Sequence, residues 1–166
     1  MNQDIRSQIE TQTKELQEVH DSKEVTETEE IKDTVEGIKD ELIPRALITA
    51  TEQSKGKVRV GALVLDKKGM IIAKGCNSYT KTHPQQALAA FTVGKPKQIF
   101  LHAEIDTLVR CREDPHTILV CRLRPNGQVA LAKPCSVCMS AIEKSGCKIV
   151  YYTTDAGGFE NIEIGD

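Results

Sequence analysis

The chain has 166 residues, a length that fits one domain with an extension. Its net charge of −2 is unevenly divided: residues 1–40 carry 12 acidic and 5 basic side chains, whereas residues 41–166 carry 12 acidic and 17 basic ones. Only 4% of the residues are aromatic, and no apolar run approaches the ~18 residues of a membrane span. These features argue against a nucleic-acid groove and a membrane anchor, and because no signal-peptide pattern is visible we expect a cytoplasmic location.

The N-terminal part differs in character from the rest. We expect an acidic, partly helical or mobile extension at residues 1–34 and a folded domain at residues 35–166, because residues 1–30 hold few large apolar side chains. Apolar residues from Ile31 to Leu42 then recur at helical spacing. Pro44 interrupts or restarts a helix that continues to about Ser54.

The following segments alternate between strand and helix patterns. Val58 to Ala73 predicts a strand pair around a glycine turn, and residues 85–93 predict a short helix. Helices are expected at residues 102–113 and from Pro134 to Gly146, and strands at residues 118–122, 129–132 and 147–153. This order predicts an α/β fold, a three-layer α/β/α domain on a five-stranded mixed sheet.

One His and two Cys form the most informative pattern in the chain. His-Ala-Glu at 102–104 opens one predicted helix, and Pro-Cys-Ser-Val-Cys at 134–138 opens another. Residues i and i+2 can share a site only where a helix begins, and cysteines at i and i+3 point the same way. His102, Cys135 and Cys138 therefore predict a zinc site between two helix N-termini, with the fourth position open for water. Glu104 is placed to move protons beside that water.

Two other interpretations of these residues stay open. A structural zinc site would need a fourth protein ligand, for which the candidates are the other His residues and Cys76, Cys111, Cys121 and Cys147. A redox Cys-x-x-Cys pair would need a thioredoxin-like strand before it and would leave His102 and Glu104 unexplained. Six cysteines without a secretory signal favour reduced thiols and metal over disulfides.

The two motifs resemble those of the cytidine deaminase superfamily, and within it the deoxycytidylate deaminases. Gly-Cys-Asn at 75–77 and the strand pattern at 148–155 extend the resemblance, which covers about residues 56–158. The resemblance implies a cytidine-deaminase-like fold, a zinc-dependent deaminase domain, and contact of Asn77 with the sugar of the substrate. Transfer RNA adenosine deaminases share both motifs, but their Asn lies much closer to the His, whereas Asn77 precedes His102 by 25 residues. Residues 78–101 hold no Cys and only His83, so we expect no second zinc.

The predicted function is hydrolytic deamination of a cytosine nucleotide, dCMP to dUMP, with Zn2+ as cofactor and Glu104 as proton shuttle. The residues expected to contact the substrate are Asn77, Ala103, His83 and Tyr151. The basic balance of residues 41–166 suits a phosphate-bearing ligand, and the candidates for binding it are Lys81, His83, Lys95, Arg122 and Arg124. We expect a small-molecule nucleotide as substrate and a homo-oligomer as the assembly, with neither membrane nor nucleic acid as partner.

Two alternatives belong to other classes. A polynucleotide deaminase, acting on tRNA adenosine or single-stranded cytosine, would need a groove with several phosphate contacts and stacking rings. A non-catalytic zinc scaffold with an acidic, partner-binding N-terminus would have no need of the Glu104 carboxylate.

Overall fold

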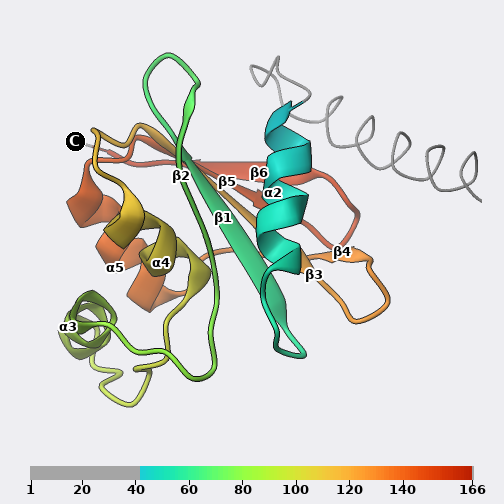
Figure 1. The fold of residues 1–166 in the computed structure, drawn as a ribbon. Helices are drawn as coiled ribbons and strands as arrows, with labels where there is room; N and C mark the ends of the chain where they lie inside the picture. The colour runs from blue at the N-terminus through green and yellow to red at the C-terminus, as the bar shows by residue number, and fades with distance from the viewer. Residues whose placement is uncertain (1–41, 166) are drawn as a thin grey trace, which may run out of the picture.

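The computed structural model describes residues 42–165, which form three layers (Figure 1). The elements in chain order are α2 (Leu42–Glu52), β1 (Arg59–Leu65), β2 (Ile71–Cys76), α3 (Pro84–Thr92), α4 (Ala103–Arg110), β3 (Thr117–Leu123), β4 (Val129–Ala130), α5 (Ser136–Ser145), β5 (Ile149–Thr153) and β6 (Phe159–Glu163). None of these helices has the length and apolar character needed to cross a bilayer. The predicted extension at 1–34 and the helical pattern before residue 42 lie outside the described residues.

The strands join in one mixed sheet. Its main path runs β2-β1-β3-β5-β6, and β4 pairs with β3 beside this path. β3 and β5 are parallel, whereas the other pairs are antiparallel. A parallel pair needs a crossover, and α5 lies in the connection that supplies it. The predicted α/β class and mixed sheet are therefore confirmed.

Helices cover both faces of the sheet, as Figure 1 shows. Successive side chains of a strand point to opposite faces. Leu63 and Leu119 pack with residues of α2 on one face, whereas Val64 and Val120 pack with residues of α4 and α5 on the other. The sequences of the central strands β1 and β3 are nearly continuous apolar runs, because helices shield both faces of these strands from solvent. The arrangement is the predicted α/β/α sandwich.

Three details of the sheet and helices differ from the prediction. Residues 129–132 supply only the two-residue β4, and the fifth place in the main path belongs to β6, which was not predicted. The β6 sequence, Phe-Glu-Asn-Ile-Glu, has only two apolar residues, which occupy its two partly buried positions, whereas its other three residues are exposed. α4 ends at Arg110 and not near residue 113, since Cys111 already has an extended backbone.

Close packing of α4 on β1 and β2 fixes the position of the first motif. A side chain at Gly75 would approach Asp106 Oδ2 to 2.6 Å and Thr107 Oγ1 to 2.7 Å, so the helix can lie here only over a glycine. The backbone N–H of Cys76 donates to Asp106 Oδ2 at 3.1 Å, and the Thr107 hydroxyl donates to the Ala62 carbonyl at 3.3 Å. These hydrogen bonds hold the start of α4 against the sheet.

Candidate metal centre

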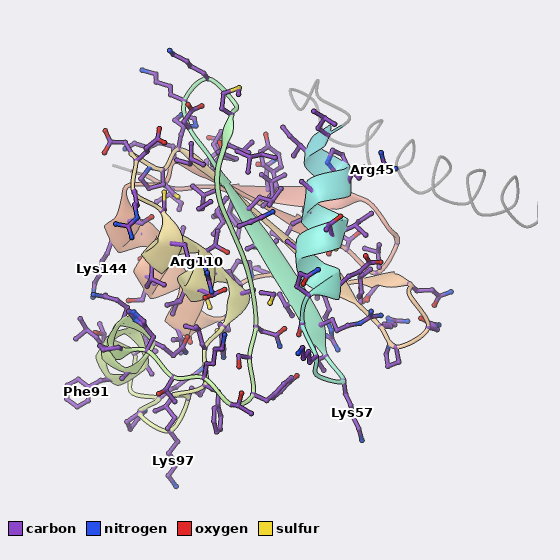
Figure 2. The ribbon with its side chains drawn as sticks, in the orientation of Figure 1. Arg45, Lys57, Phe91, Lys97, Arg110 and Lys144 are labelled. Carbon is purple, nitrogen blue, oxygen red and sulfur yellow. The ribbon has the colours of Figure 1, made fainter. Side chains whose placement is uncertain are left out.

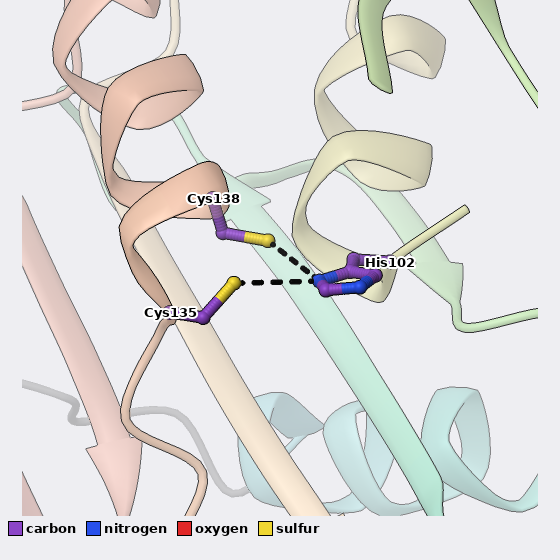
Figure 3. A group of neighbouring side chains, drawn as sticks. All are labelled: His102, Cys135 and Cys138. Carbon is purple, nitrogen blue, oxygen red and sulfur yellow. Dashed lines mark hydrogen bonds between the residues drawn. The ribbon is translucent and has the colours of Figure 1, made fainter. Parts of the chain in front are cut away.

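The topology brings the two motifs together. α4 leads into β3 and α5 leads into β5, and because β3 and β5 are parallel neighbours, both helices begin at the same edge of the sheet. His102 is the N-cap of α4 and Cys135 the N-cap of α5, and neither side chain makes a capping hydrogen bond. Cys138 joins them from the first turn of α5 (Figure 3). The three side chains converge from segments more than thirty residues apart in sequence.

The spacing of the three side chains fits a zinc ion. Nδ1 of His102 lies 3.3 Å from Sγ of Cys138 and 3.5 Å from Sγ of Cys135, and all three ligand atoms lie within 4.8 Å of one another. Zinc bonds of about 2.0 Å to nitrogen and about 2.3 Å to sulfur, at a tetrahedral angle, separate N and S by about 3.5 Å. A tetrahedral zinc can therefore occupy the space between these atoms.

No fourth protein ligand completes the group within residues 42–165. Among the sequence candidates for that role, the free thiols of Cys76, Cys111, Cys121 and Cys147 lie outside the group, as do His83 and His116, whereas His20 is not among the described residues. Structural zinc sites are almost always closed by four protein ligands, whereas catalytic sites have three and leave one position for water or substrate. The ligand count is that of a catalytic site.

The two cysteines of the group differ in proton affinity. A hydrogen bond from the Cys138 thiol, followed by one from His102, lowers the pKa of Cys135 to about 3. The hydrogen bond between the two cysteines, together with burial, raises the pKa of the Cys138 thiol well above its usual range. The hydrogen bond with Cys135 raises the pKa of His102. One thiolate is thus stabilised by its neighbours, and thiolate is the form that binds zinc.

Glu104 lies beside this group in the first turn of α4. Its side chain is buried, with 5% exposed, and burial raises the pKa of its carboxyl group. It does not belong to the ligand group itself. A carboxyl group whose pKa moves toward neutrality can both accept and return a proton, which is what general acid–base chemistry requires.

A pocket of about 490 Å³ opens next to these residues. His102, Glu104 and Cys135 line it together with Arg122, and exposed lysines at positions 97 and 133 contribute to its rim. Figure 2 shows Lys97 on the loop after α3, where its side chain extends away from the body of the molecule. Glu104 is the only carboxylate among the described lining residues, so the pocket is predominantly cationic.

The residues predicted to contact substrate have different locations. Asn77 and Ala103 line this pocket. His83 instead caps α3, accepts a hydrogen bond from the Gln85 backbone at 3.1 Å, and lines a separate cavity of about 410 Å³ between α3, α4 and α5. Tyr151 packs with the α2 face of the sheet, whereas the motif helices lie on the other face. The structure therefore does not bring His83 or Tyr151 to the ligand group.

The predicted phosphate candidates are also separated. Arg122 lines the pocket beside the ligand group, whereas Lys81 lines a neighbouring cavity of about 450 Å³. Arg124 is exposed and forms an ion pair with Asp155 at 2.9 Å. The sequence did not single out Lys133, although its position directly before the Pro-Cys motif was a usable signal.

Asn77 has a structural role in addition to its position in the pocket. Its Oδ1 accepts hydrogen bonds from the Val60 backbone at 2.9 Å and from the Ser54 hydroxyl at 2.5 Å. Its Nδ2 donates to the Val58 carbonyl at 3.0 Å. These contacts join the end of the α2 segment to the start of β1, and an amide nitrogen retains a second N–H after this donation.

Comparison with known proteins identifies the family. The family model that describes the cytidine and deoxycytidylate deaminase zinc-binding region matches residues 38–154. The match spans well over half of the chain, and the chain belongs to this family. Both the family and the His-Cys-Cys donor set assign Zn2+ as the cofactor. No curated protein matches the sequence.

Three solved structures, of two different deaminases, are similar to this chain. A mutant cytidine deaminase from Mycobacterium tuberculosis is 16% identical with a TM-score of 0.47, over 74% of this chain and 88% of that one. The dCMP deaminase of cyanophage S-TIM5 in apo form is 24% identical with a TM-score of 0.41, over 68% of this chain and 83% of that one. The same phage enzyme in complex with dCMP and dUMP is 23% identical with a TM-score of 0.40, over 70% and 87%.

Proposed function

We propose that this protein removes the amino group of a cytosine nucleotide by hydrolysis of its C4–N bond, and that it converts dCMP to dUMP. The observation that carries the proposal is the His102, Cys135 and Cys138 group with the buried Glu104 beside it, next to a pocket whose other charged lining residues are cationic. A cationic pocket favours a substrate with a phosphate over a neutral nucleoside. Membership of the zinc deaminase family supports the reaction class.

The chain's own residues would divide the chemistry as follows. Zinc held by the three ligands would supply Lewis acidity, which can lower the pKa of water from 15.7 to about 7. Glu104 would accept one proton from the attacking water and pass it to N3, and would then pass the second proton, from the hydroxyl group added at C4, to the amino group, which leaves C4 as ammonia. Its burial supports this role, because the raised pKa makes the carboxyl group a competent donor as well as an acceptor.

Positioning of the base and sugar would fall to neighbouring groups. The first backbone N–H groups of a helix have no intrahelical partner, so the start of α4 at Ala103 offers hydrogen bonds to the ring. Asn77 would hold the sugar through the amide N–H that Val58 does not use.

A side-by-side substrate screen tests this proposal. The zinc-loaded full-length protein is offered dCMP, CMP, dCTP, deoxycytidine, adenosine and a cytosine-containing oligonucleotide, and ammonia release is measured. We expect the highest kcat/KM on dCMP. The proposal is wrong if no cytosine mononucleotide is deaminated.

One observation favours a second candidate, deamination of a polynucleotide. Tyr79 and Phe100 line the same pocket and are 49% and 48% exposed, so two aromatic rings are available for base stacking at its mouth. In the same screen, activity confined to the oligonucleotide would select this candidate.

We also propose that the protein assembles as a homo-oligomer in the cytoplasm. Leu88 and Phe91 of α3 are 56% and 74% exposed, and Figure 2 shows Phe91 on the outer side of this helix. Large exposed apolar side chains of this kind suit a contact between copies. Sedimentation velocity of the full-length protein would test this, and a monomer at micromolar concentration would contradict it. The division of the chain between residues 34 and 35 stays a prediction.

A further inference from the structure

Arg122 is a charged residue within β3, a strand whose other side chains are almost all apolar and buried. It belongs to β3, and its partners across the sheet are Val60 on β1 and Ala130 on β4. Side chains alternate along β3, so Arg122 points to the same face as Val120, which packs against α4 and α5. Arg122 therefore projects from the sheet into the pocket that His102 and Glu104 line.

The guanidinium of Arg122 is left without a protein partner at its buried atom. Nε is buried and has no hydrogen-bond partner within the described part of the chain. Buried N–H groups are nearly always paired, and a charged one left unpaired is especially unfavourable. Arg124, two residues further on, shows the contrast, because it is exposed and paired with Asp155 at 2.9 Å.

The residues around Arg122 indicate which kind of group could accept hydrogen bonds from its guanidinium. The pocket's only described carboxylate is Glu104, which is buried in the first turn of α4 and makes no ion pair with Arg122. Exposed Lys97 and Lys133 add positive charge at the rim. A guanidinium presents its N–H donors as a planar fork that matches two oxygens of a phosphate group. The missing partner is therefore best supplied by an anionic ligand with paired oxygens.

We propose that Arg122 is the residue that selects a nucleotide over a nucleoside, by binding the phosphate group of the substrate through its guanidinium fork. The inference rests on the proposed function, which it deepens. It assigns phosphate recognition to a residue of β3 that lines the pocket, and not to the loop that carries Lys81 and His83. Lys97 and Lys133 raise the local concentration of the anion but do not provide the fork.

Three variants test this role in the zinc-loaded, full-length protein. Arg122→Gln removes the charge, Arg122→Lys keeps the charge but removes the fork, and Arg124→Gln removes a neighbouring arginine that is exposed and outside the pocket. Kinetics on dCMP and deoxycytidine are measured for each, together with calorimetric binding of dUMP and of inorganic phosphate. Zinc content and thermal unfolding establish that each variant is folded and loaded.

We expect Arg122→Gln to lower kcat/KM on dCMP by about ten- to a hundredfold, because charge-assisted hydrogen bonds contribute on this scale. On deoxycytidine the change should stay within about threefold, and dUMP affinity should fall in parallel with dCMP activity. Arg122→Lys should recover only part of the loss, and Arg124→Gln should match the wild type. Because the lysine variant retains charge and length, it keeps the test decisive if the glutamine variant does not fold.

The failures of this inference and of the proposed function are distinguishable. An unchanged dCMP-to-deoxycytidine ratio in both Arg122 variants would overturn the role of Arg122 while leaving the deaminase activity standing. A wild-type protein inactive on every cytosine mononucleotide would instead refute the proposed function. The calorimetric measurement would still test the anion site in that case. Equal dUMP binding by the wild type and both Arg122 variants would overturn the role of Arg122.

Discussion

Replacement of Glu104 by glutamine separates the chemistry of the site from its metal binding. The substitution keeps the shape of the side chain and its burial but removes the group that accepts and returns protons. Glu104 is 5% exposed and is not one of the three residues grouped as metal ligands, so fold and zinc content should be unchanged.

The size of the effect follows from the pocket lining. General acid–base groups contribute about 10²- to 10⁴-fold, and Glu104 would serve more than one proton transfer. No other described carboxylate lines the pocket and could take over the role. We therefore expect kcat to fall by at least about 10⁴-fold, which corresponds to about 5 kcal/mol in the activation free energy.

The assay is steady-state ammonia release on dCMP, with zinc measured by elemental analysis in the same samples. Glu143→Gln is a matched control, because this residue lies on α5 outside the pocket. A Glu104→Gln protein that turns over within about tenfold of the wild type would refute the assignment, as would one that has lost its zinc.

Four further predictions concern metal, stability and chain length. Cys135→Ala should reduce zinc from about one ion per chain to almost none by elemental analysis, whereas Cys111→Ala should retain it, because only Cys135 belongs to the ligand group. Burial raises the pKa of the Cys121 thiol from 9.0 to about 11, so the folded state retains its proton in a range where the unfolded state releases it. The stability should thus fall as pH rises from about 9 to 11, by up to about 3 kcal/mol, and chemical denaturation of Cys121→Ala should show a flatter pH dependence. Gly75→Ala should lower the unfolding free energy by about 1–3 kcal/mol in urea titrations, because its methyl group would crowd Asp106 and Thr107. Removal of residues 1–30 should leave the domain folded and active, since this segment has little apolar surface, and precipitation or inactivity of the truncated protein would contradict this.

The sequence was enough to identify the ligand group, because the signals that mark it lie within a few residues of each ligand. His102 and Cys135 are N-caps, and the apolar spacing that follows each of them marks a helix start. The Cys-x-x-Cys spacing places both sulfurs on one side of the first turn. Pro134 before the turn and the left-handed Gly146 after the helix delimit α5, and both could be identified without a structure.

Other elements depended on contacts that have no local sequence signal. β6 forms because β5 offers it five consecutive backbone partners, and its own composition is too polar to predict a strand. Adjacent residues of a strand point to opposite faces of the sheet, but only the packed layers show that Tyr152 faces the motif helices and that Tyr151 faces α2.

The pocket itself was decided by the tertiary structure. The sequence offered several candidate cations, among which His83 was favoured as a substrate contact because it follows Asn77 closely in the chain. Capping of α3 holds His83 in another cavity, whereas the register of β3 between β1 and β4 directs Arg122 into the pocket. The chain alone determines which residues can bind a metal or an anion, because this depends on their chemistry. Which of them meet depends on how helices and strands distant in sequence pack together, and only the fold specifies that.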